Sequence, residues 1–255
     1  MLIDCLSLPE DLPADQLGFE WGSADEHIAP PGETPLSRAL QGKTNAGVIT
    51  FIAGCALLCA KRLERIGDTR RLVMLSECLL CFEASPHYYS GYRRPKPASP
   101  PPAVEQVISA IFTRATAVFQ QLPGEHSSFP PMSAAKNIVA LTKLVLGPNN
   151  RKYLENWIKT AVGRLNQFAP NDNQVFKTRL DFETEEEWQI VKRRNFGVPV
   201  PLEVLNDKIA LTESDLPRLY ADFLKSVKWR ENPYLRSPDA LVEAGFQGTA
   251  YQWPA

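Results

Sequence analysis

The sequence contains only three histidines and five cysteines, and neither residue type occurs in a pattern typical of catalysis. The histidines, His27, His87 and His126, are expected in loops, and none accompanies a nucleophile-elbow motif. Because acid–base chemistry in hydrolases most often depends on a positioned histidine, the sequence disfavours a hydrolase. A triad assembled from distant residues is left open.

The cysteines do not indicate a disulfide framework. Their number is odd, and Cys55, Cys59, Cys78 and Cys81 lie inside apolar runs. The i,i+4 and i,i+3 spacings would place these four sulfurs on two consecutive helices, where a metal could in principle bind. Structural zinc, however, usually takes its ligands from tight knuckles, and cysteine is among the most frequently buried side chains. We therefore predict buried, reduced thiols, with no metal and no other cofactor.

The chain also lacks the features of a secretion signal, because its first five residues have neither a basic start nor an uninterrupted apolar run. The stretch between Lys43 and Lys61 is 17 residues long and uncharged, but it includes Thr44, Asn45 and Thr50. A membrane-spanning helix needs about 20 predominantly apolar residues, so this run predicts a fully buried central helix. These features predict a cytoplasmic protein without a membrane segment.

A phosphate-binding loop is incomplete in this sequence. Gly42-Lys43-Thr44 has the residues that end such a loop, but the required first glycine is replaced by Ser37. Residues 35–41 moreover favour a helix and not the strand and loop that cradle phosphates. Nucleotide binding is therefore disfavoured, and a turn between two helices explains these residues.

Apolar residues recur at helical spacing along most of the chain. The clearest amphipathic pattern contains Val104, Val107, Ile108, Ile111, Ala115, Val118, Phe119 and Leu122. Capping residues predict further helices from about Asp68, over 133–146, after Asn149, over 185–196, from Thr212 with Asp215, and from Ser237-Pro238. No repeat of fixed period and no hairpin-turn chemistry is evident. The predicted fold is all-α, a multi-helix bundle or layered helical array, with at most a short strand pair near 198–211.

Charge and proline divide the chain into three parts, which we expect to form one cooperative domain. They are a Pro-containing arm (1–34) with eight carboxylates and no Lys or Arg, a helical core (35–170) with 17 basic and 7 acidic side chains, and a helical C-terminal extension (171–255). Opposite charge should draw the arm to the body, where Leu17, Phe19 and Trp21 are expected to dock.

Two surfaces are predicted to bind a macromolecular partner. The docked arm would present carboxylates to a basic protein, and residues 86–94 concentrate the tyrosine and arginine that are common in binding hot spots. Alternatively, the tyrosines fasten this segment to the helical core. Nucleic-acid binding is disfavoured, because neither the net charge of -1 nor a module signature supports it. The predicted partner-binding residues are Asp11, Asp15, Glu20, Asp25, Glu26, Tyr88, Tyr89 and Tyr92.

The general form of the chain suggests one family. It combines the Lys43 to Lys61 helix, the Pro-rich connector at 95–102 and a closing run from Asn232-Pro233-Tyr234 through Gly248-Thr249. This arrangement resembles the helical, enzymatically silent immunity proteins that bacteria encode beside secreted antibacterial toxins, including those delivered by type VI secretion. The resemblance implies tight binding that blocks a toxin's active site or the access of its substrate. It includes no diagnostic motif, so no functional residue is carried over.

The preferred prediction is therefore a non-enzymatic protein that inhibits by binding. Without a signal peptide, the resemblance implies a cognate toxin acting in the cytosol, such as a nuclease, whose basic cleft suits an acidic inhibitor. A helical enzyme is the first alternative, and a deep polar pocket with His87 or His126 beside carboxylates would favour it. A structural adaptor of a secretion or phage assembly is the second, and stable higher oligomers would favour it. A homo-oligomer is compatible with each.

Overall fold

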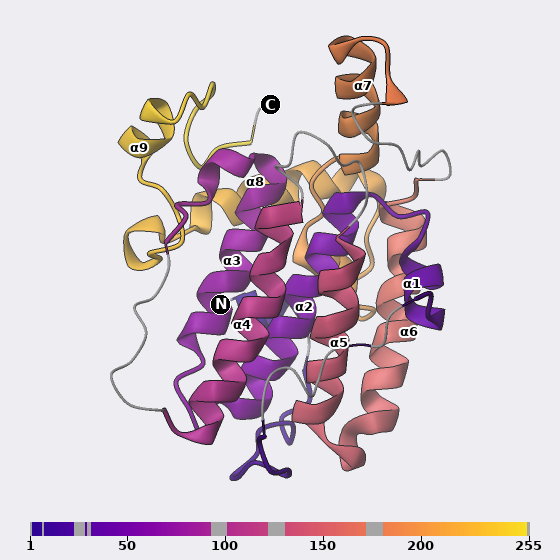
Figure 1. Cartoon of the computed structure of the whole chain (residues 1–255), viewed down its shortest axis with the longest axis vertical. Coiled ribbons are helices and arrows are strands. Elements are labelled where there is room, and N and C mark those ends of the chain that lie inside the picture. The colour runs from indigo at the N-terminus through magenta and orange to yellow at the C-terminus, as the bar shows by residue number, and fades with distance from the viewer. Residues whose placement is uncertain are drawn as a thin grey trace.

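The computed structural model describes residues 2–6, 8–22, 29, 32–92, 101–121, 131–171 and 181–253. Within these ranges the chain forms nine α-helices joined by loops and short 3-10 turns, with no β-sheet (Figure 1). The all-α prediction is confirmed. The short strand pair near 198–211 does not form, since Leu202–Leu205 is a 3-10 turn (η6). Pro199 and Pro201 precede it, and neither has the backbone N–H that a strand ladder requires.

Five long helices make the body of the molecule, and Figure 1 shows them running roughly along its longest axis. They are α2 (Asn45–Leu63), α3 (Arg70–Ala84), α4 (Ala103–Gln121), α5 (Met132–Leu146) and α6 (Arg151–Phe168). The helix α2 lies in the centre, where α3, α4, α5 and α6 all pack on it. Its most apolar window has a mean hydropathy of 1.6 and is 89% buried inside the protein. The apolar side chains of α2 are therefore covered by other helices of the protein, as the uncharged run predicted.

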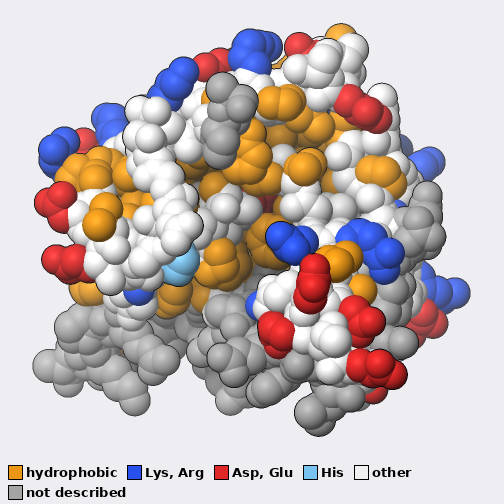
Figure 2. Space-filling model, turned by 90° about the horizontal axis from the view of Figure 1, so that it is seen from above, with side chains coloured by type: hydrophobic (Ala, Val, Ile, Leu, Met, Phe, Trp, Pro, Cys, Tyr) orange, Lys and Arg blue, Asp and Glu red, His pale blue; other side chains and the backbone are white. Residues whose placement is uncertain are grey.

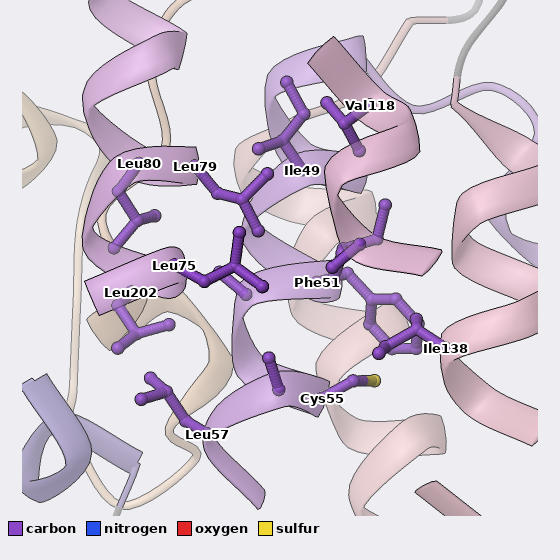
Figure 3. Packing of buried hydrophobic residues seen from close by; sticks show 14 of the residues in the cluster. Ile49, Phe51, Cys55, Leu57, Leu75, Leu79, Leu80, Val118, Ile138 and Leu202 are labelled. Atoms are coloured by element: carbon purple, nitrogen blue, oxygen red, sulfur yellow. The ribbon is translucent and has the colours of Figure 1, made fainter. Parts of the chain in front are cut away.

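The residues of α2 allow this crowding. Thr44 caps the helix by accepting a hydrogen bond from the Gly47 amide at 3.2 Å, and every residue from Asn45 to Ala60 is buried. Phe51 stacks on Trp157 of α6 with ring centroids 5.7 Å apart. The core around it is filled by side chains from α3, α4 and α5 (Figure 3). Burial on every side explains why this helix has apolar residues all round.

The shorter helices gather at one end of the bundle. They are α7 (Glu185–Phe196), α8 (Leu216–Ser226) and α9 (Pro238–Glu243), while α1 (Pro35–Leu40) precedes α2. In Figure 1, α8 crosses near the upper end and α7 projects from it. The bounds of α7 are those predicted, and Thr184 accepts a hydrogen bond from the Glu187 amide at 3.2 Å. Elsewhere the ends shift slightly: α3 begins at Arg70, and Asn150, not Asn149, precedes α6.

A buried carboxyl ties the segment before η6 to the bundle. Glu83 of α3 is 3% exposed, and its Oε2 accepts a hydrogen bond from the Val200 amide at 2.7 Å. Its Oε1 lies 2.8 Å from the hydroxyl oxygen of Thr50, which also lies 2.9 Å from the carbonyl oxygen of Val200. Burial raises the pKa of Glu83 well above that of an ordinary glutamate. The network fixes residues 200–205 against α2 and α3.

The described part of the acidic arm lies on the body. Leu6 and Leu12 are buried in the core cluster, with Leu17, Phe19 and Trp21 half-buried against it. The Ala14 amide donates to the Arg62 carbonyl at 2.9 Å, and the Arg62 guanidinium donates to the Leu12 carbonyl at 2.8 Å. The predicted aromatic anchors thus do pack on the body, but leucines and main-chain groups supply the deepest attachment.

Candidate binding groove

A groove of about 810 Å³ lies between α3 and α8. The helix α3 supplies Arg70, Val73, Met74, Glu77 and Leu80, with Thr69 just before it, and α8 supplies Leu219, Tyr220, Asp222, Phe223 and Ser226. The 3-10 turn η1 (Leu2–Leu6), Glu64, the 201–203 segment and residues 228, 231 and 232 complete the lining. This volume is in the range of about 300–1,000 Å³ that is typical of ligand pockets.

Hydrogen bonds between distant segments hold the walls of the groove together. The Tyr220 hydroxyl on α8 donates to the Leu80 carbonyl on α3 at 2.5 Å. The Asn206 side chain donates to the Cys5 carbonyl at 2.7 Å, so η1 is joined to the end of η6. These bonds fasten α8 to α3 and η1 to the end of η6 through main-chain acceptors.

The lining of the groove has an excess of negative charge. Its charged residues are five carboxylates, Glu64, Glu77, Glu203, Asp222 and Glu231, and two basic residues, Arg70 and Lys228. Three carboxylates have cationic partners: Glu64 with Lys61 at 2.7 Å, Asp222 with Arg218 at 3.5 Å, and Glu231 with Lys228 at 3.9 Å. Among the described residues, the other two, Glu77 and Glu203, have no cation within 4 Å, although the charge of Lys228 still lowers the pKa of Glu77.

Glu77 and Glu203 bond to neutral groups. The Asn232 side chain donates to Glu77 Oε2 at 2.8 Å, and the Cys5 thiol donates to Glu203 Oε1 at 3.6 Å. Burial raises the pKa of Glu77 above its ordinary value. Burial, together with the charge of Glu203, raises the pKa of Cys5 to about 12. A thiol must ionise to act as a nucleophile, so Cys5 is a hydrogen-bond donor here and not an activated nucleophile.

No described histidine lines this groove. His87 lies elsewhere, in the 3-10 turn Pro86–Tyr88, and its Nδ1 is 3.2 Å from Ser85 Oγ. His27 and His126 lie outside the described residues. The described part of the chain also contains no group of three or more His, Cys, Asp or Glu side chains arranged to hold a metal ion. The groove thus combines an apolar lining with an excess of carboxylates.

Comparison with known proteins gives no match. No protein-family model matches the sequence, and no curated protein or solved structure is significantly similar to the chain. The resemblance to immunity proteins therefore rests on the general form of the sequence. The role of the groove has to be argued from the chemistry of its own residues.

The predicted acidic surface is partly described. Asp11, Asp15 and Glu20 are all exposed. Asp15 lies 3.3 Å from Arg65 in an ion pair, and both side chains are exposed to solvent. Asp25 and Glu26 lie outside the described residues. The described carboxylates thus remain on the surface while the arm beneath them is packed on the body.

The three predicted tyrosines differ in position. Tyr88 is 0% exposed, its ring packs on Phe246, and its hydroxyl accepts a hydrogen bond from the Tyr251 amide. It is therefore a core residue and not a surface contact. Tyr89 is half-buried and stacks on Phe119 with ring centroids 4.0 Å apart. The alternative, in which the tyrosines fasten this segment to the core, describes both residues, and only Tyr92 is exposed, at 41%.

Sequence reasoning missed the groove, although two helices contained a signal for it. Beyond the stripe that faces the core, α3 has the half-buried Val73 and Met74 on the groove side. Likewise, α8 adds Leu219 and Phe223 to the residues that it buries. When the apolar surface of a helix is wider than the contact with one neighbouring helix requires, a second binding surface is indicated. The segments that complete the groove come from both ends of the chain and could not be placed by periodicity.

The four clustered cysteines are buried free thiols, as predicted. Cys59 lies 3.5 Å from the Thr142 hydroxyl, and the Cys78 thiol donates to the Tyr234 carbonyl at 3.4 Å. Burial raises the pKa of Cys59 to about 12. These thiols fill the contacts that α2 and α3 make with neighbouring elements. Burial keeps the thiols protonated.

A second hollow, of about 390 Å³, lies at the end of the bundle where α6, α8 and the C-terminal segment meet. Figure 2 looks onto this end and shows apolar side chains gathered there among charged ones. Val198, 64% exposed, is part of the rim, and Glu213 is the one charged residue in the lining. With so little charge, this hollow indicates no particular partner chemistry.

Proposed function

We propose that this protein is a non-enzymatic, cytoplasmic inhibitor that binds a basic partner, in the manner of immunity proteins that neutralise toxins such as nucleases. The observation that carries the proposal is how the acidic arm is attached. Buried leucines and main-chain hydrogen bonds hold it, and those bonds use no carboxylate. The exposed side chains of Asp11 and Glu20 are therefore left for solvent or for a partner.

A fixed array of carboxylates suits this role for a physical reason. Side chains on an attached segment lose less conformational freedom on binding than side chains on a free tail. A surface of one charge also attracts an oppositely charged partner over distances of about 10 Å at moderate salt, which speeds association. The exposed Asp15–Arg65 pair contributes little to stability, so Asp15 can exchange its partner for a basic group of the target.

Reversing the charge of the arm tests the proposal. The double substitution Asp11→Lys, Glu20→Lys is expected to weaken binding to the partner roughly tenfold at low salt. The salt dependence of affinity should become shallower, because fewer opposite charges face each other. The dissociation constant is measured by titration calorimetry at two ionic strengths. A matched control, Glu186→Lys with Glu243→Lys, reverses two exposed carboxylates outside the arm and is expected to leave affinity unchanged.

The partner for this experiment is the product of the neighbouring open reading frame. Expressed alone in the cytosol, it is expected to arrest growth, and co-expression of this chain is expected to restore growth. An adjacent metabolic operon, or a toxic neighbour that this chain neither binds nor neutralises, would contradict the proposal. Equal binding by the arm variant and the wild type would remove the arm from the interface.

A further inference from the structure

We propose that the groove between α3 and α8 binds a cationic amphipathic helix of the partner protein, with its apolar side chains between the two helices and its basic side chains at Glu77 and Glu203. The inference rests on the proposed function, because it names the element of the partner that the inhibitor holds. Helix-in-groove binding is a common mode of peptide recognition, in which residues at i, i+3, i+4 and i+7 supply the anchors.

The length of the groove fits such a helix. The α3 wall extends from Thr69 to Leu80, which corresponds to about 16 Å at a rise of about 1.5 Å per residue. A partner helix of about three turns has the same length. The α8 wall contributes Leu219 and Phe223, one turn apart, so apolar side chains face the occupant from two helices.

The fold buries the apolar residues of the groove only in part. Val73, Met74 and Phe223 are half-buried and pack at the margin of the core cluster. Covering their remaining surface would stabilise a complex by about 25 cal/mol for each Å² removed from water. Met74 is unbranched and adapts to the shape of an inserted side chain.

Charge decides which amphipathic helix fits. The lining has three more acidic than basic residues, and every carboxylate in it except Glu77 and Glu203 has a cation within 4 Å. Burial removes hydration from the Glu77 carboxylate and raises its pKa, while hydrogen bonds from Asn232 and the Lys228 amide and the charge of Lys228 partly oppose this shift. An ammonium or guanidinium group from a partner would replace that hydration, whereas an acidic helix would be repelled.

The test uses the full chain and three labelled 14-residue peptides. One has leucine at i, i+3, i+4 and i+7 with lysine elsewhere, the second has glutamate for lysine, and the third has the lysine peptide's composition without an apolar face. We expect only the first to bind, measured by fluorescence anisotropy. The double variant Glu77→Gln, Glu203→Gln should bind it about tenfold more weakly, since two charge pairs are lost.

Two controls keep the result interpretable. Glutamine still accepts the hydrogen bonds from Asn232 and Cys5, so the double variant should give the wild-type circular dichroism spectrum and an unfolding midpoint no lower than that of the wild type. The matched variant Glu186→Gln, Glu243→Gln removes two exposed carboxylates outside the groove and should bind the lysine peptide as the wild type does.

The inference is overturned if the glutamate peptide or the peptide without an apolar face binds equally well, or if the double variant binds as tightly as wild type. It is also overturned if sedimentation shows a dimer that the lysine peptide cannot displace, since a second copy would then cover the groove. A toxin neutralised equally by wild type and double variant contradicts this inference alone. Peptide binding without neutralisation of the neighbouring gene product contradicts the proposed function alone.

Discussion

Replacement of Glu83 by glutamine is expected to remove a pH-dependent loss of stability that the wild-type protein shows above about pH 4.5. The single hydroxyl hydrogen of Thr50 has three acceptors nearby. The Ala46 carbonyl is the farthest, at 3.2 Å, and the two shorter contacts are to Glu83 Oε1 at 2.8 Å and to the Val200 carbonyl at 2.9 Å. Both are satisfied when Glu83 carries a proton and donates it to Thr50, whose own hydrogen then goes to Val200. Glutamine reproduces this pattern, because its amide donates to Thr50 and its carbonyl accepts from the Val200 amide.

The sign of the effect follows from the raised pKa of Glu83 in the folded protein. Below about pH 4.5 the carboxyl is protonated in both folded and unfolded chains, so its contribution to stability is fully present. As the pH rises further, the unfolded chain releases the proton and the folded chain keeps it. Each pH unit then costs up to about 1.4 kcal/mol until the folded-state pKa is reached.

Urea unfolding of wild type and Glu83→Gln between pH 4 and pH 8 measures this difference. The variant should be the more stable protein at pH 8, and the gap should close towards pH 4. Glu83→Ala, in contrast, leaves the Val200 amide without its acceptor and should lose about 3 kcal/mol. Parallel pH profiles for wild type and Glu83→Gln would show that Glu83 is ionised in the fold. Glu186→Gln, on the exposed face of α7, serves as the control.

Replacement of Gly47 by valine is expected to destabilise the protein by about 3 kcal/mol. A Cβ at this position would lie 2.7 Å from the Cβ of Ala169, which cannot rotate away, and 3.3 Å from a methyl of Leu165. The start of α2 would have to separate from the end of α6, which would strain the hydrogen bond from the Thr44 amide to the Ala169 carbonyl at 2.9 Å.

The matched control is Gly163→Val on α6, where a Cβ meets nothing within 4 Å and the residue is exposed. It should change the free energy of unfolding by less than about 0.5 kcal/mol, because valine is at least as good a helix former as glycine. Thermal and urea unfolding of both variants measures the difference. Equal stability of the two would mean that α2 and α6 tolerate separation at this end.

Local sequence features predicted the helices well. Periodic apolar residues identified α4, and the capping residue Thr184 with the basic last turn and Gly197 identified the ends of α7. The uncharged run between Lys43 and Lys61 identified α2 as the core helix. In each case the signal lies within the element itself, where the spacing of side chains determines which face is buried.

The tertiary features were less accessible. Tyr88 was expected on the surface because the residues that cover it, Phe246 and Tyr251, are about 160 positions away along the chain. The groove depends likewise on a hydrogen bond between Asn206 and Cys5, two residues that no local pattern links. The charge imbalance of the arm was readable from the sequence, but its attachment through Leu6 and Leu12 was not.

The groove also has a consequence for the timing of synthesis. Its lining extends in sequence from Leu2 to Asn232, so the ribosome must have synthesised the chain as far as Asn232 before all parts of the lining can meet. A nascent chain that has emerged only as far as α3 presents Val73 and Met74 uncovered, as a natural contact for a chaperone. If the groove binds another protein as proposed, chains that end before Asn232 should lack this binding.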